Sequence, residues 1–565
     1  MRSLLTAIAL LASTLAAAEE EPKPADRIEQ CLVCHDPGGD GAPPVDGKQL
    51  RASLHFLNDV ACSDCHEGYT PEHAGGELPA LAPGEQAVVD KLSAASWGEG
   101  GSRRRVTAPR AYLACANCHS GEAEAYAASI HGRWLREPRA AAGPTCASCH
   151  GSPHAVTALA PYALAPGARA TIPEDRRAMA SRCEACHGNE GFARSAGLDP
   201  EAPATYHDSI HGRLVRVGSP FAPSCANCHA PPPAQGGTHG IRARTDPASM
   251  VNPARRREAC ARCHQGVTDS FASLIAHKPI QESNGRVPHL VHVAFSWLTT
   301  LTLLFFAFHV VVDFVYELRT RLARRSAPPA SDAARTVVRF DVHQRIQHAF
   351  MLSGVILLGL TGWPLRGAGS AEAAPYSRAF LALFGGPHGA AIWHRVGAVL
   401  IIASAAYHLV YLTFLASSKR LPLSMLPTPK DAIDLRDNVL FMLGLRKERP
   451  RFDRFMYLEK FDYWAVFWGI VMMVGTGFIF WFPAWFARWA PSWLITTAQI
   501  VHGEEATLAI LFLFVVHFYN VHLKPSIFPM NWAWLTGRIS LETMKHEHAL
   551  EYERLKDDPP PEEKE

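Results

Sequence analysis

The sequence predicts a mainly α-helical membrane protein with an exported first half. Three observations predict this fold class: a short apolar segment at the N-terminus, seven Cys-x-x-Cys-His motifs in the first half, and five apolar runs of membrane length in the second. The 565 residues carry a formal net charge of only +2. Because nucleic-acid binding needs a strongly basic surface, the sequence gives no support for it.

The N-terminus has the pattern of a secretory signal peptide. Arg2 precedes an apolar run over residues 4–15, and three alanines ending at Ala18 follow it. This run is too short to cross a bilayer comfortably. We therefore expect residues 1–18 to be a cleaved signal peptide and residues 19–286 to form an exported domain.

All 14 cysteines fall in Cys-x-x-Cys-His motifs. The motif cysteines are Cys31 and Cys34, Cys62 and Cys65, Cys115 and Cys118, Cys146 and Cys149, Cys183 and Cys186, Cys225 and Cys228, and Cys260 and Cys263; the histidines that follow them are His35, His66, His119, His150, His187, His229 and His264. A disulfide framework does not need this spacing, and zinc does not need a histidine after every pair. Two such thiols can bond the vinyl groups of a haem while the histidine ligates its iron. The sequence therefore predicts seven haem c groups.

Seven irons also need ligands on their second face. Residues 19–286 contain eight further histidines but only two methionines. The predicted distal ligands are His55, His73, His131, His154, His211, His239 and His277, with His207 left over and His289 or His292 as substitutes for His277. Two histidines on every iron would leave no site for a substrate and would give low potentials. This pattern indicates a haem-dense domain with little regular secondary structure that conducts electrons.

An internal repeat orders these histidines. The elements Ser53-Leu54-His55, Ser129-Ile130-His131 and Ser209-Ile210-His211 each lie between two successive motifs. Repetition at this scale predicts similar structural units. We expect three such units and a closing half unit that ends at His277.

Five apolar runs follow, over residues 287–316, 346–365, 390–415, 461–482 and 495–519. Each has about the 20 residues that cross a bilayer as a helix. We expect a connecting helix and loop over 287–342, a four-helix cytochrome b core over 343–525 and a tail over 526–565. Basic residues concentrate in 317–342 and 417–460. Because cytoplasmic loops are rich in Lys and Arg, the haem domain is expected in the periplasm and the C-terminus in the cytoplasm.

Histidines inside these runs predict two b-type haems. A histidine in a membrane helix is costly without a partner or a metal. His394 and His408 lie 14 residues apart in the third run, and His502 and His517 lie 15 apart in the fifth. Each pair shares roughly one helix face. Because both helices are expected to run from the periplasm to the cytoplasm, His394 is level with His502 and His408 with His517. His348 competes with His408 as the partner of His517, and His309 leaves a third b haem open.

Several phrases resemble a known family. Arg345-Ile346-Gln347-His348, Leu360-Thr361-Gly362 and His517-Phe518-Tyr519-Asn520-Val521-His522 are similar to the di-haem cytochrome b subunits of formate dehydrogenases and nickel-iron hydrogenases. The fusion to a multihaem domain resembles the inner-membrane cytochrome b/c quinol dehydrogenases of metal-respiring bacteria. This resemblance implies that His348 pairs with His517 and His394 with His502. His408 departs from the family pattern, so either His348 or His408 could pair with His517.

The resemblance also implies a function at the bacterial inner membrane. A quinol, menaquinol in anaerobes, would be oxidised, and electrons would pass through the b haems and seven c haems to a periplasmic c-type cytochrome or terminal reductase. Such electron transport serves anaerobic or extracellular respiration. From the sequence itself, we expect the quinone site beside the cytoplasmic b haem, near His517 and Lys460. Two alternatives stay open: an electron-relay subunit of a larger complex, and a multihaem reductase with one open haem. Glu504 and Glu505 are candidates for proton transfer on the periplasmic side.

Overall fold

A computed structural model describes residues 29, 32, 45–65, 108–136, 143–155, 173–274, 277, 285–323 and 335–557. This part of the chain is mainly α-helical and divides into two compact units. The first unit comprises Met1–Pro200 and Pro223–Ala259, and the second comprises Glu201–Ala222 and Cys260–Glu565.

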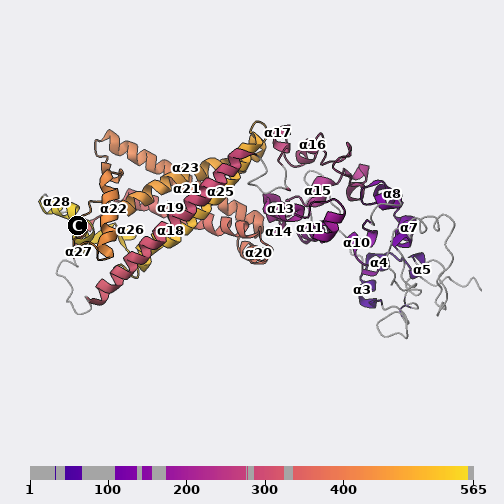
Figure 1. Cartoon of the computed structure of the whole chain (residues 1–565), viewed down its shortest axis with the longest axis horizontal. Helices are drawn as coiled ribbons and strands as arrows, with labels where there is room; N and C mark the ends of the chain where they lie inside the picture. Colours follow the sequence, from indigo (N-terminus) through magenta and orange to yellow (C-terminus); the bar gives the residue numbers. More distant parts are fainter. Residues whose placement is uncertain are drawn as a thin grey trace, which may run out of the picture. The chain divides into compact units, whose positions relative to one another are not determined.

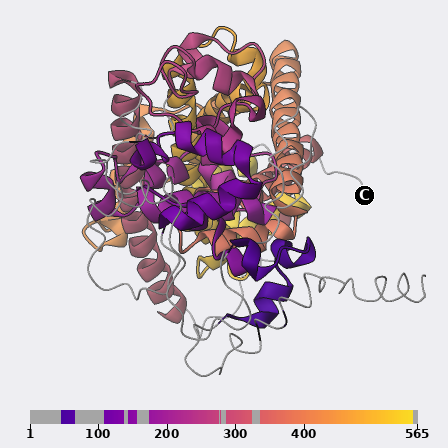
Figure 2. The same cartoon turned by 90° about the vertical axis from the view of Figure 1, so that its right-hand side faces the viewer.

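The first unit consists of short helices joined by irregular chain, drawn in indigo to magenta in Figures 1 and 2. Its described helices are α3 (Gly47–Arg51), α4 (Leu54–Leu57), α5 (Cys62–Cys65), α7 (Ala108–Cys118), α8 (Ser120–Ala128), α9 (Arg133–Arg136), α10 (Cys146–His150), η1 (Pro153–Ala155), α11 (Pro173–His187), α12 (Glu190–Ser195), α15 (Cys225–His229), η2 (Pro233–Gln235), η3 (Gly237–Gly240) and α16 (Arg256–Ala261).

The motif helices of this unit are fixed by their caps. In α10, Ser148 Oγ accepts a hydrogen bond from the Thr145 amide at 3.0 Å. In α15, Asn227 Oδ1 does the same for the Ser224 amide at 2.8 Å. Reciprocal caps satisfy backbone groups that a very short helix would otherwise expose. They therefore hold the Cys-x-x-Cys-His segments in a helical turn.

The second unit contains five long helices (Figure 1): α18 (Arg286–Ala323), α19 (Val342–Gly367), α21 (Gly386–Ser417), α23 (Tyr457–Trp481) and α25 (Ser492–Phe512), which continues in the π-helical segments η5 (Leu513–His517) and η6 (Tyr519–Leu523). All five are long and apolar enough to cross a membrane. The structure thus confirms the predicted mainly α-helical fold with five helices that are candidates for spanning a membrane. In the bundle α19 packs against α21, and α25 packs against α18 and α23.

Shorter elements complete the second unit. They are α13 (Ala202–Asp208), α14 (Ile210–Arg216), α17 (Asp269–Ala272), β1 (Thr336–Val338), α20 (Ala374–Ala382), η4 (Leu423–Met425), α22 (Pro429–Met442), α24 (Pro483–Phe486), α26 (Ala533–Thr536), β2 (Arg538–Ser540), α27 (Leu541–Glu547) and α28 (Ala549–Asp557). The strands β1 and β2 pair antiparallel, with Thr336 opposite Ser540. No pattern in the sequence predicted this pairing.

The segment around α14 packs on the ends of the long helices. Val217, Ala368, Leu381 and Ala390 form a buried apolar cluster at the ends of α14, α19, α20 and α21. Near the start of α25, Thr268 donates a hydrogen bond to the carbonyl oxygen of Ala487 at 3.2 Å. The seventh Cys-x-x-Cys-His motif therefore lies in a segment that contacts the membrane helices.

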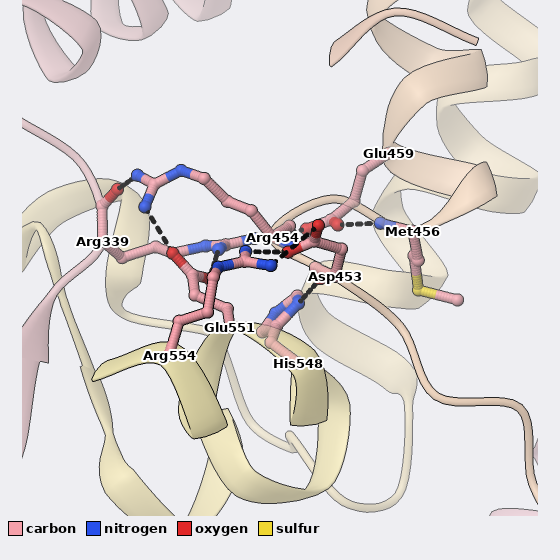
Figure 3. Close-up of polar contacts among 8 residues, drawn as sticks. All are labelled: Arg339, Asp453, Arg454, Met456, Glu459, His548, Glu551 and Arg554. Atoms are coloured by element: carbon pink, nitrogen blue, oxygen red, sulfur yellow. Dashed lines mark hydrogen bonds and ion pairs between the residues drawn. The ribbon is translucent and has the colours of Figure 1, made fainter. Parts of the chain in front are cut away.

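A buried charge network joins the C-terminal helices to the segment before α23 (Figure 3). Arg339, whose side chain is 2% exposed, donates to one carboxylate oxygen of Glu551 at 2.9 Å. Arg454 donates to the other oxygen at 2.6 Å, and Arg339 also bonds the Arg454 carbonyl. Asp453 pairs with Arg554 of α28. These contacts fix the backbone that leads into α23.

Candidate haem sites

Two imidazoles on opposite faces of one metal have a defined separation. Imidazole–metal bonds of roughly 2 Å, as found for zinc, and a ring radius of about 1.1 Å place the ring centres about 6.3 Å apart. A porphyrin supplies the other four ligands of the iron, so a haem site needs only two protein side chains. Each predicted ligand can be judged by this separation.

His394 of α21 and His502 of α25 face each other with their ring centres 6.5 Å apart. The Nδ1 atom of His394 lies 2.8 Å from Thr361 Oγ1, and that of His502 lies 2.9 Å from Thr476 Oγ1. Metal-ligating histidines usually donate their second ring N–H to an oxygen, which fixes the tautomer and the ring orientation. These bonds leave Nε2 of both rings as the atom that would ligate a metal.

Each of these threonines is followed by a glycine, and the histidine ring packs against that glycine. A Cβ at Gly362 would lie 3.2 Å from His394 Cε1, and a Cβ at Gly477 would lie 3.6 Å from His502 Cε1. A Thr-Gly pair on α19 thus positions His394, and a second Thr-Gly pair on α23 positions His502. Sequence reasoning did not assign this role, although the repeated dipeptide was a signal for it.

The second membrane site is arranged around His517. Its Nδ1 lies 2.9 Å from Asp462 Oδ2, and His348 is close enough to His517 to interact with it electrostatically. His408 has other partners: its Nδ1 lies 2.8 Å from Gln347 Oε1 and its Nε2 lies 2.8 Å from Tyr463 Oη. The structure therefore brings His348 toward His517, whereas both ring nitrogens of His408 have hydrogen-bond partners.

The π-helical segment η5 ends at His517. Fifteen residues of ideal α-helix would place His517 about 60° away from the face that carries His502. A π turn contains one residue more than an α turn, so it changes the angle around the helix axis between His502 and His517. Such π segments are frequent at functional sites. The sequence did not indicate this irregularity.

Outside the five long helices, three motif histidines are each paired with a predicted distal ligand. The ring centres are 6.4 Å apart for His131 and His187, 6.0 Å for His150 and His239, and 6.2 Å for His211 and His264. All three separations agree with the value expected for two imidazoles on one iron. The sequence could name these histidines but not their pairing.

The Ser-x-His elements share one local structure. Ser53 Oγ accepts a hydrogen bond from the amide three residues later at 3.2 Å, and Ser129 and Ser209 do the same at 3.0 and 3.2 Å. In the second and third elements the capped residues are Gly132 and Gly212, where a Cβ would overlap the carbonyl oxygen of a preceding tyrosine. The serine cap and the glycine therefore determine where the histidine between them lies.

The surroundings of the paired histidines outside the membrane helices favour the neutral imidazole. Burial lowers the pKa of His131, His150 and His211, and the partner histidine of each lowers it further. For His211 the pKa falls to about 4. Neutral imidazole is the form that ligates metals, so these environments favour ligation at physiological pH.

Motif cysteines lie next to those of neighbouring motifs. Cys65 is close enough to Cys115 and Cys118 to interact electrostatically with both. The next motifs follow in order, since Cys115 lies close to Cys146, Cys149 lies close to Cys183 and Cys186, and Cys183 lies close to Cys225. The second to sixth attachment sites therefore neighbour one another in the order of the sequence.

The remaining predicted ligands have less defined surroundings. His277 Nδ1 lies 2.8 Å from the carbonyl oxygen of Ala202, which is a typical contact of a ligating histidine. His55, His119, His154 and His229 lie in described parts of the chain, and His207 is 5% exposed beside Tyr206. The predicted residues Cys31, Cys34, His35, His66 and His73 lie outside the described residues.

Glu504 and Glu505, the two acidic residues beside His502, have different surroundings. Glu504 lies 3.5 Å from Arg366 and 3.8 Å from His292. Glu505 is 4% exposed, and its Oε2 has no hydrogen-bond partner in the described part of the chain. Only Glu504 is therefore balanced by a neighbouring charge in this part of the chain.

In the described residues, three or more His, Cys, Asp or Glu side chains nowhere gather into a group that could hold a metal ion without a cofactor. Histidine pairs are the arrangement that haem requires, and the four ring pairs fit it. In comparisons with known proteins, no protein-family model matches the chain, and no curated protein matches it.

Proposed function

We propose that the chain is a membrane quinol dehydrogenase that carries electrons from menaquinol through two b haems to seven c haems and on to a periplasmic acceptor. The observation that carries the proposal is the set of four histidine pairs at 6.0–6.5 Å. Three of them include a Cys-x-x-Cys-His histidine, and the fourth joins two membrane helices. When bound, the haems supply one-electron redox chemistry, and the chain supplies ligands, spacing and surroundings.

The arrangement of the motifs supports a conducting role. The second to sixth attachment sites are neighbours in sequence order. The seventh lies in the segment that contacts the start of α25, the helix that carries His502. We therefore place the seventh haem at the point where electrons leave the membrane.

Histidine on both faces of an iron leaves no coordination site for a substrate. The four pairs thus favour electron transfer over a reductase with an open haem. A relay subunit of a larger complex would use the same pairs but would not react with quinol by itself.

Quinol-driven reduction of the purified full chain tests the proposal. Reduced menadione, a soluble naphthoquinol, is added anaerobically, and the b and c α-bands are followed against full reduction by dithionite. The proposal predicts that both bands appear without a second protein. Reduction by dithionite but not by the naphthoquinol would instead identify a relay subunit, and a high-spin haem that binds nitrite would identify a reductase.

A further inference from the structure

A cavity of about 450 Å³ lies between α18, α22 and α23. Its wall contains the aromatic residues Phe305, Phe306 and Phe461, the polar residues Thr302, Asp431 and Tyr457, and four aliphatic residues. Leu301 and Phe305 are exposed on the surface of α18. Because α18 spans the bilayer, the cavity opens toward lipid.

The size and lining of this cavity are those of a small-molecule site. Such sites typically enclose 300–1,000 Å³ and combine apolar walls with a few polar groups that orient the ligand. The connecting helix α18 lies outside the four-helix core that carries the proposed b-haem ligands. One wall of the cavity therefore comes from a helix outside that core.

Tyr457 is the polar group with the most defined surroundings. Its hydroxyl oxygen lies 2.8 Å from His309 Nε2 and accepts a hydrogen bond from Asn438 Nδ2 at 3.0 Å. All three side chains are buried. If Nε2 of His309 also donates, the tyrosine oxygen accepts both bonds, and its hydroxyl hydrogen is left to be donated to a ligand.

The cavity wall is joined to the residues that hold His517 at the second proposed b-haem site. Phe306, Phe461 and Phe512 form a cluster with ring centres 4.8–5.6 Å apart. Phe461 lines the cavity, and the next residue, Asp462, holds His517 Nδ1 at 2.9 Å. A ligand in the cavity would therefore contact Phe461, the residue that precedes the hydrogen-bond partner of His517.

We propose that this cavity binds the ring of an isoprenoid quinone or quinol, with Tyr457 donating a hydrogen bond to one ring oxygen. A planar ring fits between the phenylalanines, and its isoprenoid tail leaves past Leu301 into the bilayer. A lipid acyl chain would match the apolar wall but would not use the buried hydroxyl. This inference rests on the proposed function and adds the binding site and the residue that orients the ring.

Two variants of the full chain test the site. Tyr457→Phe removes the hydroxyl and keeps the ring, and Ala432→Trp fills the cavity from α22. Tyr463→Phe is the matched control, because Tyr463 lies on the same helix and bonds His408. Each variant is first checked for haem content and reduction by dithionite; if Ala432→Trp does not assemble, Leu301→Trp replaces it.

Two readouts are then compared: photolabelling by an azidoquinone, mapped to peptides, and the reduced-menadione concentration that half-saturates haem reduction. Losing one hydrogen bond in Tyr457→Phe should raise that concentration roughly three- to tenfold. Ala432→Trp should abolish labelling of α18 and α22 peptides, and Tyr463→Phe should match the wild type.

The outcomes separate the site from the function. If the wild type is reduced by the naphthoquinol but neither cavity variant differs from it, the cavity proposal is wrong and the quinol dehydrogenase proposal stands. Labelling of the cavity with no effect of Ala432→Trp on reduction would show that only a lipid-like chain binds there, which also overturns the proposal. A wild type that the naphthoquinol cannot reduce would refute the proposed function itself.

Discussion

At the scale of single residues, His348 and His408 differ in what their ring nitrogens contact. Both nitrogens of His408 lie 2.8 Å from neutral side chains, those of Gln347 and Tyr463. The buried Nδ1 of His348 has no hydrogen-bond partner among the described residues, and its ring lies 5.6 Å from that of Trp534. Because of this contrast, we propose His348, and not His408, as the partner of His517.

A pair of substitutions tests this assignment. We expect His408→Gln to retain both b haems, because glutamine can keep hydrogen bonds with its neighbours. His348→Leu should lose one of the two, because it removes an iron ligand. The measurement is the ratio of b to c haem in the purified variants, and the reverse result would make His408 the ligand.

Residue identity predicted much of the candidate site, and tertiary structure supplied the rest. The Cys-x-x-Cys-His spacing predicts a candidate ligand in every motif, because haem attachment would need this local pattern. The pairing of His131 with His187 joins residues 56 positions apart. No local pattern encodes such a distance, so the partner of each motif histidine could not be read from the sequence.

At the scale of elements, the Ser-Ile-His-Gly turn shows how a short motif positions a ligand. Ser209 Oγ bonds the Tyr206 carbonyl at 2.6 Å and accepts the Gly212 amide at 3.2 Å. His211 lies inside this closed turn, next to His264. The turn requires glycine because a Cβ would overlap the Tyr206 carbonyl oxygen.

Gly212→Ala should therefore displace His211 from its partner. One of the seven c haems would then lose its distal ligand and become high-spin, which electron paramagnetic resonance of the oxidised protein can quantify. Gly121→Ala is the control, because a Cβ there meets nothing within 4 Å. An entirely low-spin spectrum for Gly212→Ala would contradict the role given to this turn.

The membrane helices were predicted well because their signal is local. Every predicted apolar run lies within or nearly within an observed helix, and the ends shift by a few residues where caps decide them. Asp341, for example, accepts a hydrogen bond from the Gln344 amide at 2.8 Å and starts α19 before the apolar run. The strands β1 and β2 are three residues each and about 200 positions apart, so no periodic pattern revealed them.

At the scale of the whole molecule, the C-terminal helices stabilise the start of α23 through Glu551. Its carboxylate bridges Arg339 and Arg454, and its side chain is 9% exposed. Breaking a buried ion pair by removing one partner typically costs about 3–5 kcal/mol, because the other charge stays buried. The α23 segment that follows carries Tyr457 and Asp462, so this network also supports the proposed quinone and haem sites.

Glu551→Gln should loosen α27 and α28. We expect amide hydrogen exchange in these helices to accelerate at least roughly 100-fold, as a loss of about 3 kcal/mol implies. Glu553→Gln is the matched control, since Glu553 is 56% exposed in its pair with Arg451, and should change exchange little. Equal exchange in the two variants would show that the network does not hold the tail.

The central claim is that the whole chain is a haem protein with two kinds of site. Its most direct test is the pyridine hemochrome spectrum of the purified full chain, which measures haem c and haem b separately. The account predicts seven c haems for every two b haems, one c haem for each motif and one b haem for each membrane pair. A spectrum with seven c haems and no b haem would contradict the membrane sites, and one without haem c would contradict the account altogether.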